Sequence, residues 1–251
     1  MTLDPSMYTR YWRDGWVIVE DVFPTDEIDR IAGLAMNVSE TQADPGDSYS
    51  TDTSADGAIT APRKVDLPFV IEPEFRPFVL HPNLQSLLET LIGCPPRLFA
   101  DQIMMKPPQV GSEKQYHQDN YYFRLAPDDR VITAWIALDD VDEENGCLRY
   151  IDGSHRDGLL PHTPVPGAPH NLSPPADQVD LSKESLAIVG KGGVVFHHGL
   201  ALHTSHRNRS DRWRRGYATH WVGPDMTDLD GPDGRLATAY FNRPDLADVL
   251  A

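Results

Sequence analysis

Alternation of apolar and polar residues dominates the second half of the chain. Segments rich in β-branched and aromatic residues recur there, separated by turn-forming residues and without helical spacing between them. This pattern predicts β-strands at RLFADQIMMK, RVITAWIAL, CLRYID, GGVVFHH and RRGYATHWV. Strands that follow one another without intervening helices favour an antiparallel sandwich or barrel over a parallel sheet.

The first hundred residues combine one strand with two helices. DGWVIVEDVF alternates and predicts a short strand that follows a turn at Asp14 and Gly15. Residues 24–27 then supply an N-cap and acids for a first helical turn, after which apolar residues recur at helical spacing: Ile28, Ile31, Ala32 and Met36. A second helix is predicted over residues 81–93, with Gly93 at its end and one apolar stripe: Leu84, Leu87, Leu88 and Leu91. We expect both helices to support the β core from outside.

Two segments lack such a pattern. Residues 40–66 are dense in Ser, Asp, Thr and Gly, and residues 159–182 are rich in Pro, which prevents regular strand pairing. We interpret both as flexible loops, either surface excursions or lids over an active site. The length of 251 residues lies within the range of all-β single units, so we expect one domain over residues 1–251.

Composition narrows the classes of partner. A formal net charge of −16 argues against binding to nucleic acid or anionic lipid, whose phosphates require Lys and Arg. No run approaches the roughly 20 apolar residues of a membrane span, and the N-terminus lacks the apolar region of a signal peptide. We therefore expect a cytoplasmic protein, a monomer or homodimer, that acts on a small molecule. Cys94 and Cys147 form no CxxC pair and are expected to be reduced.

A histidine and an aspartate stand two residues apart in QYHQDNYYF, as His117 and Asp119. If this segment is a strand, both side chains point to the same side, because side chains alternate with a period of two. The pair can then ligate one metal ion. A polar pair on a surface strand is the alternative, since such triplets also occur by chance.

A third ligand must come from another segment. FHHGLALHTSHRNRS offers four histidines: His197, His198, His203 and His206. Two histidines and one carboxylate on one face of an octahedral ion leave three positions open, which is typical of non-haem Fe(II) oxygenases. Zinc prefers a tetrahedral site with one open position, and the ligand types do not exclude it. The residues alone thus leave both the histidine and the metal open.

The order of the motifs resembles the phytanoyl-CoA dioxygenase family of Fe(II)- and 2-oxoglutarate-dependent oxygenases. The resemblance covers nearly the whole chain, through DGWVIVEDV, MMKPP, YHQDNYYF, AWIALDDVDEENGCLRYIDGSH and LHTSHRNRSDRWRRGYATHW. Its most specific parts are HQD, the NGCL…GSH block and the LHxS…N…RR segment. It implies a mainly β fold, a cupin-like double-stranded β-helix or jelly roll with flanking α-helices.

Carried over residue by residue, the resemblance makes His117, Asp119 and His203 the ligands of Fe(II). His203 lies in the LHxS motif, eleven residues before Arg214, which matches the family's spacing between the last ligand and the arginine that binds 2-oxoglutarate. A planar guanidinium suits a carboxylate, because it forms two parallel hydrogen bonds. Four further residues are candidates for the cosubstrate pocket: Ser205, Trp135, Gln102 and Lys106.

The neighbouring polar residues receive other interpretations. Arg215 alternates to the other face of its strand. The remaining histidines of these segments are expected to be structural or to line the active-site cavity: His197, His198, His206 and His220. Residues that follow the first two ligands are expected to wall the substrate cavity together with the two loops: Asn120, Tyr122, Phe123 and Arg124.

The expected reaction consumes 2-oxoglutarate and O2, releases succinate and CO2, and hydroxylates an unactivated C–H bond of a small molecule. Asp119 favours hydroxylation over halogenation, because the related halogenases lack this carboxylate. Two alternatives stay open. One is a non-oxidative metal-dependent jelly-roll enzyme, an isomerase or hydrolase, which would not need Arg214 at its spacing from His203. The other is a sensor that binds metal or 2-oxoglutarate without turnover.

Overall fold

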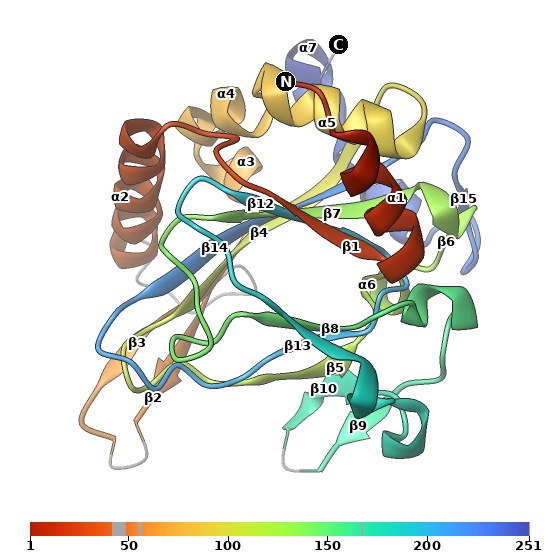
Figure 1. Ribbon diagram of the computed structural model, residues 1–251. Helices are drawn as coiled ribbons and strands as arrows, with labels where there is room; N and C mark the ends of the chain where they lie inside the picture. Colours follow the sequence, from red (N-terminus) through yellow and green to blue (C-terminus); the bar gives the residue numbers. More distant parts are fainter. Residues whose placement is uncertain (42–48, 55–56, 167, 251) are drawn as a thin grey trace.

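Two antiparallel sheets face each other in the computed structural model, which describes residues 1–41, 49–54, 57–166 and 168–250 (Figure 1). The larger sheet has the order β1-β12-β7-β14-β4-β3-β2: Trp16–Val19, Val194–His198, Val131–Ala137, Arg214–Val222, Arg97–Lys106, Thr60–Asp66 and Tyr49–Thr53. The smaller sheet has the order β11-β8-β13-β5: Glu184–Ala187, Leu148–Ile151, His203–Ser205 and Lys114–His117. The predicted mainly β, double-stranded β-helix class is confirmed.

The predicted strands of the second half all form. β4 and β14 cover the segments RLFADQIMMK and RRGYATHWV from end to end. They pair with each other, and β14 pairs with β7 on its other side, so every residue of β14 except Arg215 is buried. β-branched and aromatic side chains suit such strands because they pack well on a pleated surface.

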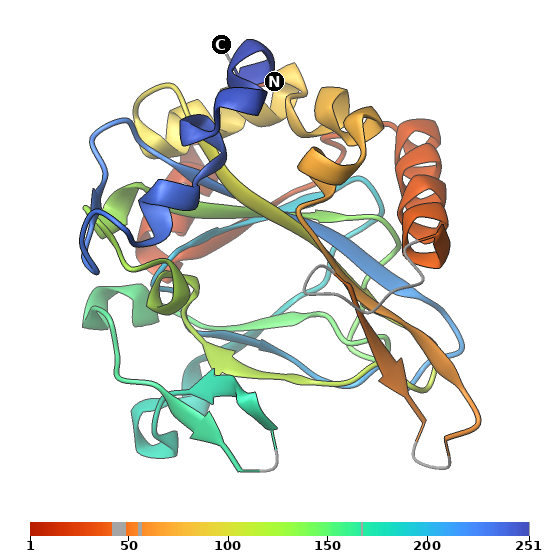
Figure 2. The ribbon, with the colours of Figure 1, turned by 180° about the vertical axis from the view of Figure 1, so that it is seen from behind.

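Helices cover the face of the larger sheet that points away from the smaller sheet (Figures 1 and 2). They are α2, α3, α4 and α5, at Thr25–Thr41, Pro68–Ile71, Arg76–Val79 and Pro82–Ile92. The two predicted helices correspond to α2 and α5, and the leucine stripe of α5 is fully buried. Gly93 ends α5 in a left-handed conformation, with φ 80°, and its N–H donates to the carbonyl oxygen of Glu89. The helix α7, Ala247–Leu250, follows at the C-terminal end.

A helix that the apolar pattern did not predict precedes β1. α1 runs over Pro5–Asp14, and the carboxylate of Asp4 accepts a hydrogen bond from the N–H of Ser6 at its start. Gly15 caps its end with φ 87°, so the predicted turn at this position is the end of a helix.

The interpretation of residues 40–66 as a loop is wrong for the part that the structure describes. β2 and β3 form an antiparallel pair there, and β3 also pairs with β4, which extends the larger sheet. A cross-strand hydrogen bond joins the hydroxyls of Thr53 and Thr60 at 3.1 Å. Threonine has a high strand propensity, and the edge of an existing sheet compensates for the lack of apolar residues. The rest of this segment, residues 42–48 and 55–56, lies outside the described residues.

The prediction that residues 159–182 cannot pair as strands is also wrong. β9, Thr163–Val165, pairs with β10, Ala168–Ser173, in a two-stranded ribbon beside the smaller sheet (Figure 2). Pro164 is tolerated in this short ribbon because an edge strand leaves one side of the backbone unpaired. A second ribbon joins β6, Leu125–Ala126, to β15, Thr227–Asp228. No helix in the described part of the chain is long and apolar enough to cross a membrane.

Candidate metal and cosubstrate site

His117 and Asp119 lie on either side of the end of a strand. β5 ends at His117, and Asp119 is the first residue of the short helix α6, Asp119–Phe123. The backbone of Gln118 between them is extended, with φ −111° and ψ 130°, so its two neighbours still project to the same side. The condition of a strand over the whole segment QYHQDNYYF is therefore met only as far as His117, whereas its consequence for the two side chains holds.

The third histidine of the cluster comes from the neighbouring strand. β13 pairs with β5 in a register that places His203 directly opposite His117. The Nε2 atoms of His117 and His203 both lie 3.6 Å from Oδ1 of Asp119. One ligand atom from each of the three residues lies within 4.8 Å of the others, which is close enough for all three to bind one metal ion.

Hydrogen bonds fix the tautomers of the two histidines. Nδ1 of His117 lies 2.8 Å from the carbonyl oxygen of Gln115, and Nδ1 of His203 lies 3.0 Å from that of Ala201. Because a carbonyl oxygen accepts, each Nδ1 carries the proton and each Nε2 presents a lone pair. Burial lowers the pKa of both rings, that of His203 to about 4, so both are neutral ligands at physiological pH.

The carboxylate of Asp119 is fixed on its other side. Its Oδ2 accepts a hydrogen bond from the Thr133 hydroxyl at 2.6 Å and one from Nε2 of His197 at 3.0 Å. Burial by itself raises the pKa of Asp119. The electrostatic influence of the neighbouring His203 ring and the hydrogen bond from His197 outweigh burial, so the pKa lies well below its ordinary value. Oδ1 stays directed at the two imidazoles, as a metal ligand requires.

Behind Asp119, three neighbouring strands contribute one row of residues. His197 on β12, Thr133 on β7 and His220 on β14 are direct cross-strand partners. The hydroxyl of Tyr150 donates to Nδ1 of His197 at 2.9 Å, and Nδ1 of His220 donates to the Thr133 hydroxyl at 2.8 Å. Two chains of hydrogen bonds thus converge on Asp119. Sequence reasoning missed Thr133 and Tyr150; the position of Thr133, two residues before Trp135 on one strand face, was the available signal.

The amide of Gln118 connects the metal motif to the segment 159–182. Its Nε2 donates to the carbonyl oxygens of Gly158 and Leu200, and its Oε1 accepts from the N–H of Leu160, each at 2.8 Å. Leu200 lies three residues before the ligand His203. The buried Gln118 side chain therefore holds β5, the segment before β9 and the approach to β13 together.

A second group of predicted residues gathers around Arg214. Its guanidinium is buried 5.0 Å from the centre of the Trp135 ring, and its Nε donates to the carbonyl oxygen of Gly146 at 3.0 Å. Lys106 is the cross-strand partner of Arg214 and donates to the carbonyl oxygens of Ser112 and Ser205. Burial lowers the pKa of Arg214 to about 10 and that of Lys106 well below its ordinary value.

Neither Arg214 nor Lys106 has a carboxylate within ion-pair distance among the described residues. Burying two cations without an anion is costly, so this end of the site fits a ligand that brings a carboxylate. Arg215 shows the contrast, because its guanidinium lies on the other face and binds Asp139 through two hydrogen bonds of 2.9 and 2.6 Å. The donor sets thus fit both a divalent metal and a dicarboxylate cosubstrate.

One cavity of 780 Å³ between the sheets contains both groups. Of the predicted residues it is lined by His117, Asp119, His203, Arg214, Ser205, Trp135, Gln102, Lys106, Tyr122 and Phe123. Gln102 lies beside the histidine row, with its Nε2 3.4 Å from Nε2 of His220. The cavity volume is that of a pocket for a small molecule.

Asn120 and Arg124, predicted as substrate contacts, are not among the described residues that line this cavity. Both polar atoms of the Asn120 side chain bond to the backbone of Leu125. Oδ1 accepts a hydrogen bond from its N–H, and Nδ2 donates one to its carbonyl oxygen. Arg124 has φ 59° at the end of α6 and pairs with Asp230 at 3.2 Å. These contacts turn the chain after the metal ligands, which explains why a helix and not a strand follows.

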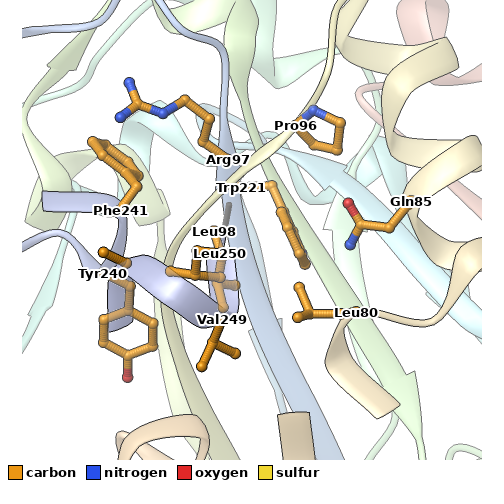
Figure 3. A pocket seen from close by; sticks show the side chains of 11 residues that line it. Leu80, Gln85, Pro96, Arg97, Leu98, Trp221, Tyr240, Phe241, Val249 and Leu250 are labelled. Atoms are coloured by element: carbon orange, nitrogen blue, oxygen red, sulfur yellow. The ribbon is translucent and has the colours of Figure 1, made fainter. Parts of the chain in front are cut away.

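Another cavity, of 470 Å³, lies between α5, the start of β4 and the C-terminal helix (Figure 3). Trp221, Leu80 and Leu250 form its apolar wall, and Arg97 lies over the ring of Phe241 at 3.7 Å. The metal-ligating cluster found among the described residues is not part of it.

Two histidines and one carboxylate beside a buried arginine, in a double-stranded β-helix, define a non-haem iron oxygenase type of site. Residues 11–216 match the family model described as phytanoyl-CoA dioxygenase (PhyH). The chain belongs to the phytanoyl-CoA dioxygenase family of Fe(II)- and 2-oxoglutarate-dependent enzymes.

Relatives and solved structures agree with this assignment. A phytanoyl-CoA dioxygenase domain-containing protein 1 homolog of Caenorhabditis briggsae is 25% identical, over 93% of this chain and 96% of its own length. The non-heme alpha ketoglutarate dependent carbocyclase SnoK is 25% identical, with a TM-score of 0.73 over 92% of this chain and 88% of its own. The epimerase SnoN, in complex with Fe3+, alpha ketoglutarate and nogalamycin RO, is 24% identical, with a TM-score of 0.70 over 92% of each chain.

Proposed function

We propose that this protein is a hydroxylase that oxidises an unactivated C–H bond of a small molecule. The observation that supports it most is the cluster of His117, Asp119 and His203. It shares a cavity with the guanidinium of Arg214, which has no carboxylate partner in the described part of the chain. Two histidines and one carboxylate leave the remaining positions of an octahedral ion open for cosubstrate and oxygen. A non-oxidative isomerase or hydrolase would not need a buried, unpaired arginine beside its metal ligands.

Each residue has a defined task in this proposal. His117, Asp119 and His203 would hold Fe(II), and Arg214 with Ser205 would hold the distal carboxylate of 2-oxoglutarate against the wall formed by Trp135. Bound iron and 2-oxoglutarate supply the oxidation, in which the cosubstrate is converted to succinate and CO2 while O2 oxidises the substrate. The cavity walls keep bulk water and other C–H bonds away from the reacting carbon.

The retained carboxylate of Asp119 supports hydroxylation over halogenation. Carbocyclisation and epimerisation are carried out by the solved relatives SnoK and SnoN on similar folds. Hydroxylation, carbocyclisation and epimerisation differ in their products, but all three use the same kind of metal and cosubstrate site. The product is therefore tested separately from the site.

The site is tested by anaerobic titration of the protein with Fe(II) and 2-oxoglutarate. We expect the metal-to-ligand charge-transfer absorption of the ternary complex, followed by succinate release when O2 is added. His203→Ala should abolish the absorption through loss of the metal, and Arg214→Met should weaken 2-oxoglutarate binding by about tenfold or more, the value of a charge-assisted hydrogen bond. The exposed neighbours His206→Ala and Arg209→Met serve as controls. Wild-type-like signals in both site variants would contradict the assignment.

The product is tested by a screen of small molecules for stimulated succinate formation. Mass spectrometry of the converted compound under ¹⁸O2 then identifies the reaction. A hydroxylase adds one labelled oxygen atom. A product of unchanged mass would show epimerisation instead, and one that has lost two hydrogens would show ring closure or desaturation.

A further inference from the structure

The charge of the cavity wall is opposite to that of the chain as a whole. The protein carries a formal net charge of −16, yet seven Lys or Arg residues and four Asp or Glu residues line the cavity. Two of the four carboxylates already have other partners and do not pair with these cations: Asp119 faces the metal position, and Asp101 accepts three hydrogen bonds. A third, Asp66, pairs with Lys64 at 2.7 Å. Three of the seven cations are paired as well, because Arg63 lies 3.7 Å from Asp52 and Arg243 lies 2.7 Å from Asp245, in addition to the pair of Lys64 with Asp66. The cations without a carboxylate partner among the described residues are Lys106, Lys114, Arg214 and Arg235, and these favour an anionic ligand.

Lys114 is a cation without a carboxylate partner among the described residues. It lies on β5 three residues before the ligand His117, and its half-buried side chain reaches into the cavity. Its Nζ donates to Oδ1 of Asn171 at 3.3 Å and lies 5.3 Å from the centre of the Tyr122 ring. An ammonium group has three N–H donors, so two remain for a ligand.

The neighbours of Lys114 also present donors. The Tyr122 hydroxyl accepts a hydrogen bond from the N–H of Leu172 at 3.3 Å, and its own proton has no acceptor in the described part of the chain. The amide nitrogen of Asn171 likewise lacks a protein acceptor there, because the contact with Lys114 uses its oxygen. We call Lys114, Tyr122 and Asn171 the donor corner. The Tyr122 ring centre lies 6.0 Å from that of His117, so the donor corner adjoins the metal position.

Arg235 adds positive charge at the same wall. Its Nε donates to the carbonyl oxygen of Tyr122 at 3.2 Å, and Arg235 is one of the residues that line the cavity. Arg214 and Lys106 already supply the cations that the cosubstrate carboxylate needs. Lys114 and Arg235, which have no carboxylate partner among the described residues, form a second positively charged place in the same cavity, and this place favours a second anion.

We propose that the substrate carries an oxyanion, a carboxylate or a phosphate, and that the donor corner binds it beside His117. This inference rests on the proposed function, because it takes the Arg214 end of the cavity to belong to 2-oxoglutarate. Binding the oxyanion at Lys114 fixes the substrate at one end, and the oxidised carbon lies within a few bonds of that group. Lys114, Tyr122 and Asn171 therefore determine specificity and do not carry out the oxidation.

The test measures binding without turnover. The full-length protein is loaded with Mn(II) and saturating 2-oxoglutarate, then titrated by calorimetry with hexanoate, hexyl phosphate and hexan-1-ol. We expect at least one anion to bind about tenfold or more tightly than the alcohol, and the tighter anion identifies carboxylate or phosphate as the group recognised. Lys114→Met should remove this preference and leave binding of hexan-1-ol and 2-oxoglutarate unchanged, and Lys114→Arg should retain most of it. The exposed Lys183→Met is the matched control.

Three results would overturn the proposal: no preference for an anion in the wild type, an unchanged preference in Lys114→Met, or a loss of 2-oxoglutarate affinity in Lys114→Met. The last would assign the lysine to the cosubstrate. Failure of the metal and 2-oxoglutarate site on which the proposed function rests is visible earlier in the same experiment, because the Mn(II)-loaded wild type would then not bind 2-oxoglutarate at all. The identity of the product, hydroxylated or not, is decided separately by the ¹⁸O2 measurement.

Discussion

Two buried aspartates line the same cavity and differ in what surrounds their oxygens. Asp119 has Oδ2 bound by Thr133 and His197, while Oδ1 faces the Nε2 atoms of two histidines. Asp101, on β4, has both oxygens bound by donors: Oδ1 by the Tyr240 hydroxyl at 2.6 Å, and Oδ2 by the Tyr217 hydroxyl at 2.5 Å and the N–H of Phe69 at 3.0 Å.

The comparison separates a metal-ligating carboxylate from a structural one. Burial affects both groups, yet the pKa of Asp119 lies well below its ordinary value and burial raises that of Asp101 to about 7. Asp119 keeps one oxygen free of hydrogen-bond donors from the described residues, and that oxygen can bind an ion. Asp101 instead joins β4 to β14 and to the C-terminal segment that carries Tyr240. Burial alone therefore does not identify a ligand; an uncommitted oxygen directed at other ligand atoms does.

Removing each carboxylate in turn is the strongest test of this difference. Asp119→Ala should lower the affinity for Fe(II) or Mn(II) by more than the 10- to 100-fold that is typical for loss of an outer-shell partner of a metal ligand. Asp101→Asn, the control in the same cavity, should bind metal as the wild type does. Calorimetric titration with Mn(II) measures both. Equal loss in the two variants would mean that Asp101 also belongs to the metal site.

Thr133→Val tests whether the bonds to Oδ2 orient Asp119. Loss of the hydroxyl removes one of the two donors and should lower metal affinity by about 10- to 100-fold without unfolding the protein. Thr219→Val is the matched control, since Thr219 is equally buried and bonds to Ala134 and Trp221 away from the ligands. The same Mn(II) titration applies, and a similar loss in Thr219→Val would point to a general packing effect.

The raised pKa of Asp101 predicts that the free energy of unfolding depends on pH. Its folded pKa of about 7 lies above the ordinary value of 3.8, so the native state keeps a proton that the unfolded state releases between these values. The stabilisation that the protonated Asp101 adds to the folded state is therefore complete below about pH 4. It is lost as the pH rises to about 7, by at most about 1.4 kcal/mol per pH unit. Denaturant unfolding of the wild type and Asp101→Asn from pH 4.5 to 8 measures this. As the pH rises, the unfolding free energy of the wild type should fall relative to that of Asp101→Asn. If the difference between the two unfolding free energies stays constant, Asp101 is already ionised at pH 4.5.

Tyr217→Phe is expected to have the smallest effect. It removes one donor from Asp101 and should cost about 1 kcal/mol of unfolding free energy, with no change in metal affinity. Denaturant unfolding and Mn(II) titration of this variant together check both statements. Weaker metal binding in Tyr217→Phe would show that the two aspartates are coupled through the cavity.

Much of the fold followed from local patterns. Alternation located β4 and β14 end to end, and helical spacing located α2 and α5, because each of these elements buries one regular face. The β2–β3 and β9–β10 pairs escaped prediction because polar and proline-containing strands obtain their stability from an adjacent sheet edge, which a local pattern does not contain.

The sequence by itself determined the kinds of ligand and the place of the strands that carry them. The HQD motif indicated two of the ligands, and the family resemblance carried by the LHTS motif and the spacing from His203 to Arg214 predicted the third ligand and the arginine that the structure brings into the same cavity. The tertiary structure alone decided which atoms remain free. The register of β5 with β13 and of β12 with β7 directs Oδ1 of Asp119 at the two imidazoles and its Oδ2 at Thr133 and His197, because strand pairing depends on residues far apart in the chain. Among the described residues, Arg214 and Lys114 bond to an oxygen of Gly146 and of Asn171 and have no carboxylate partner.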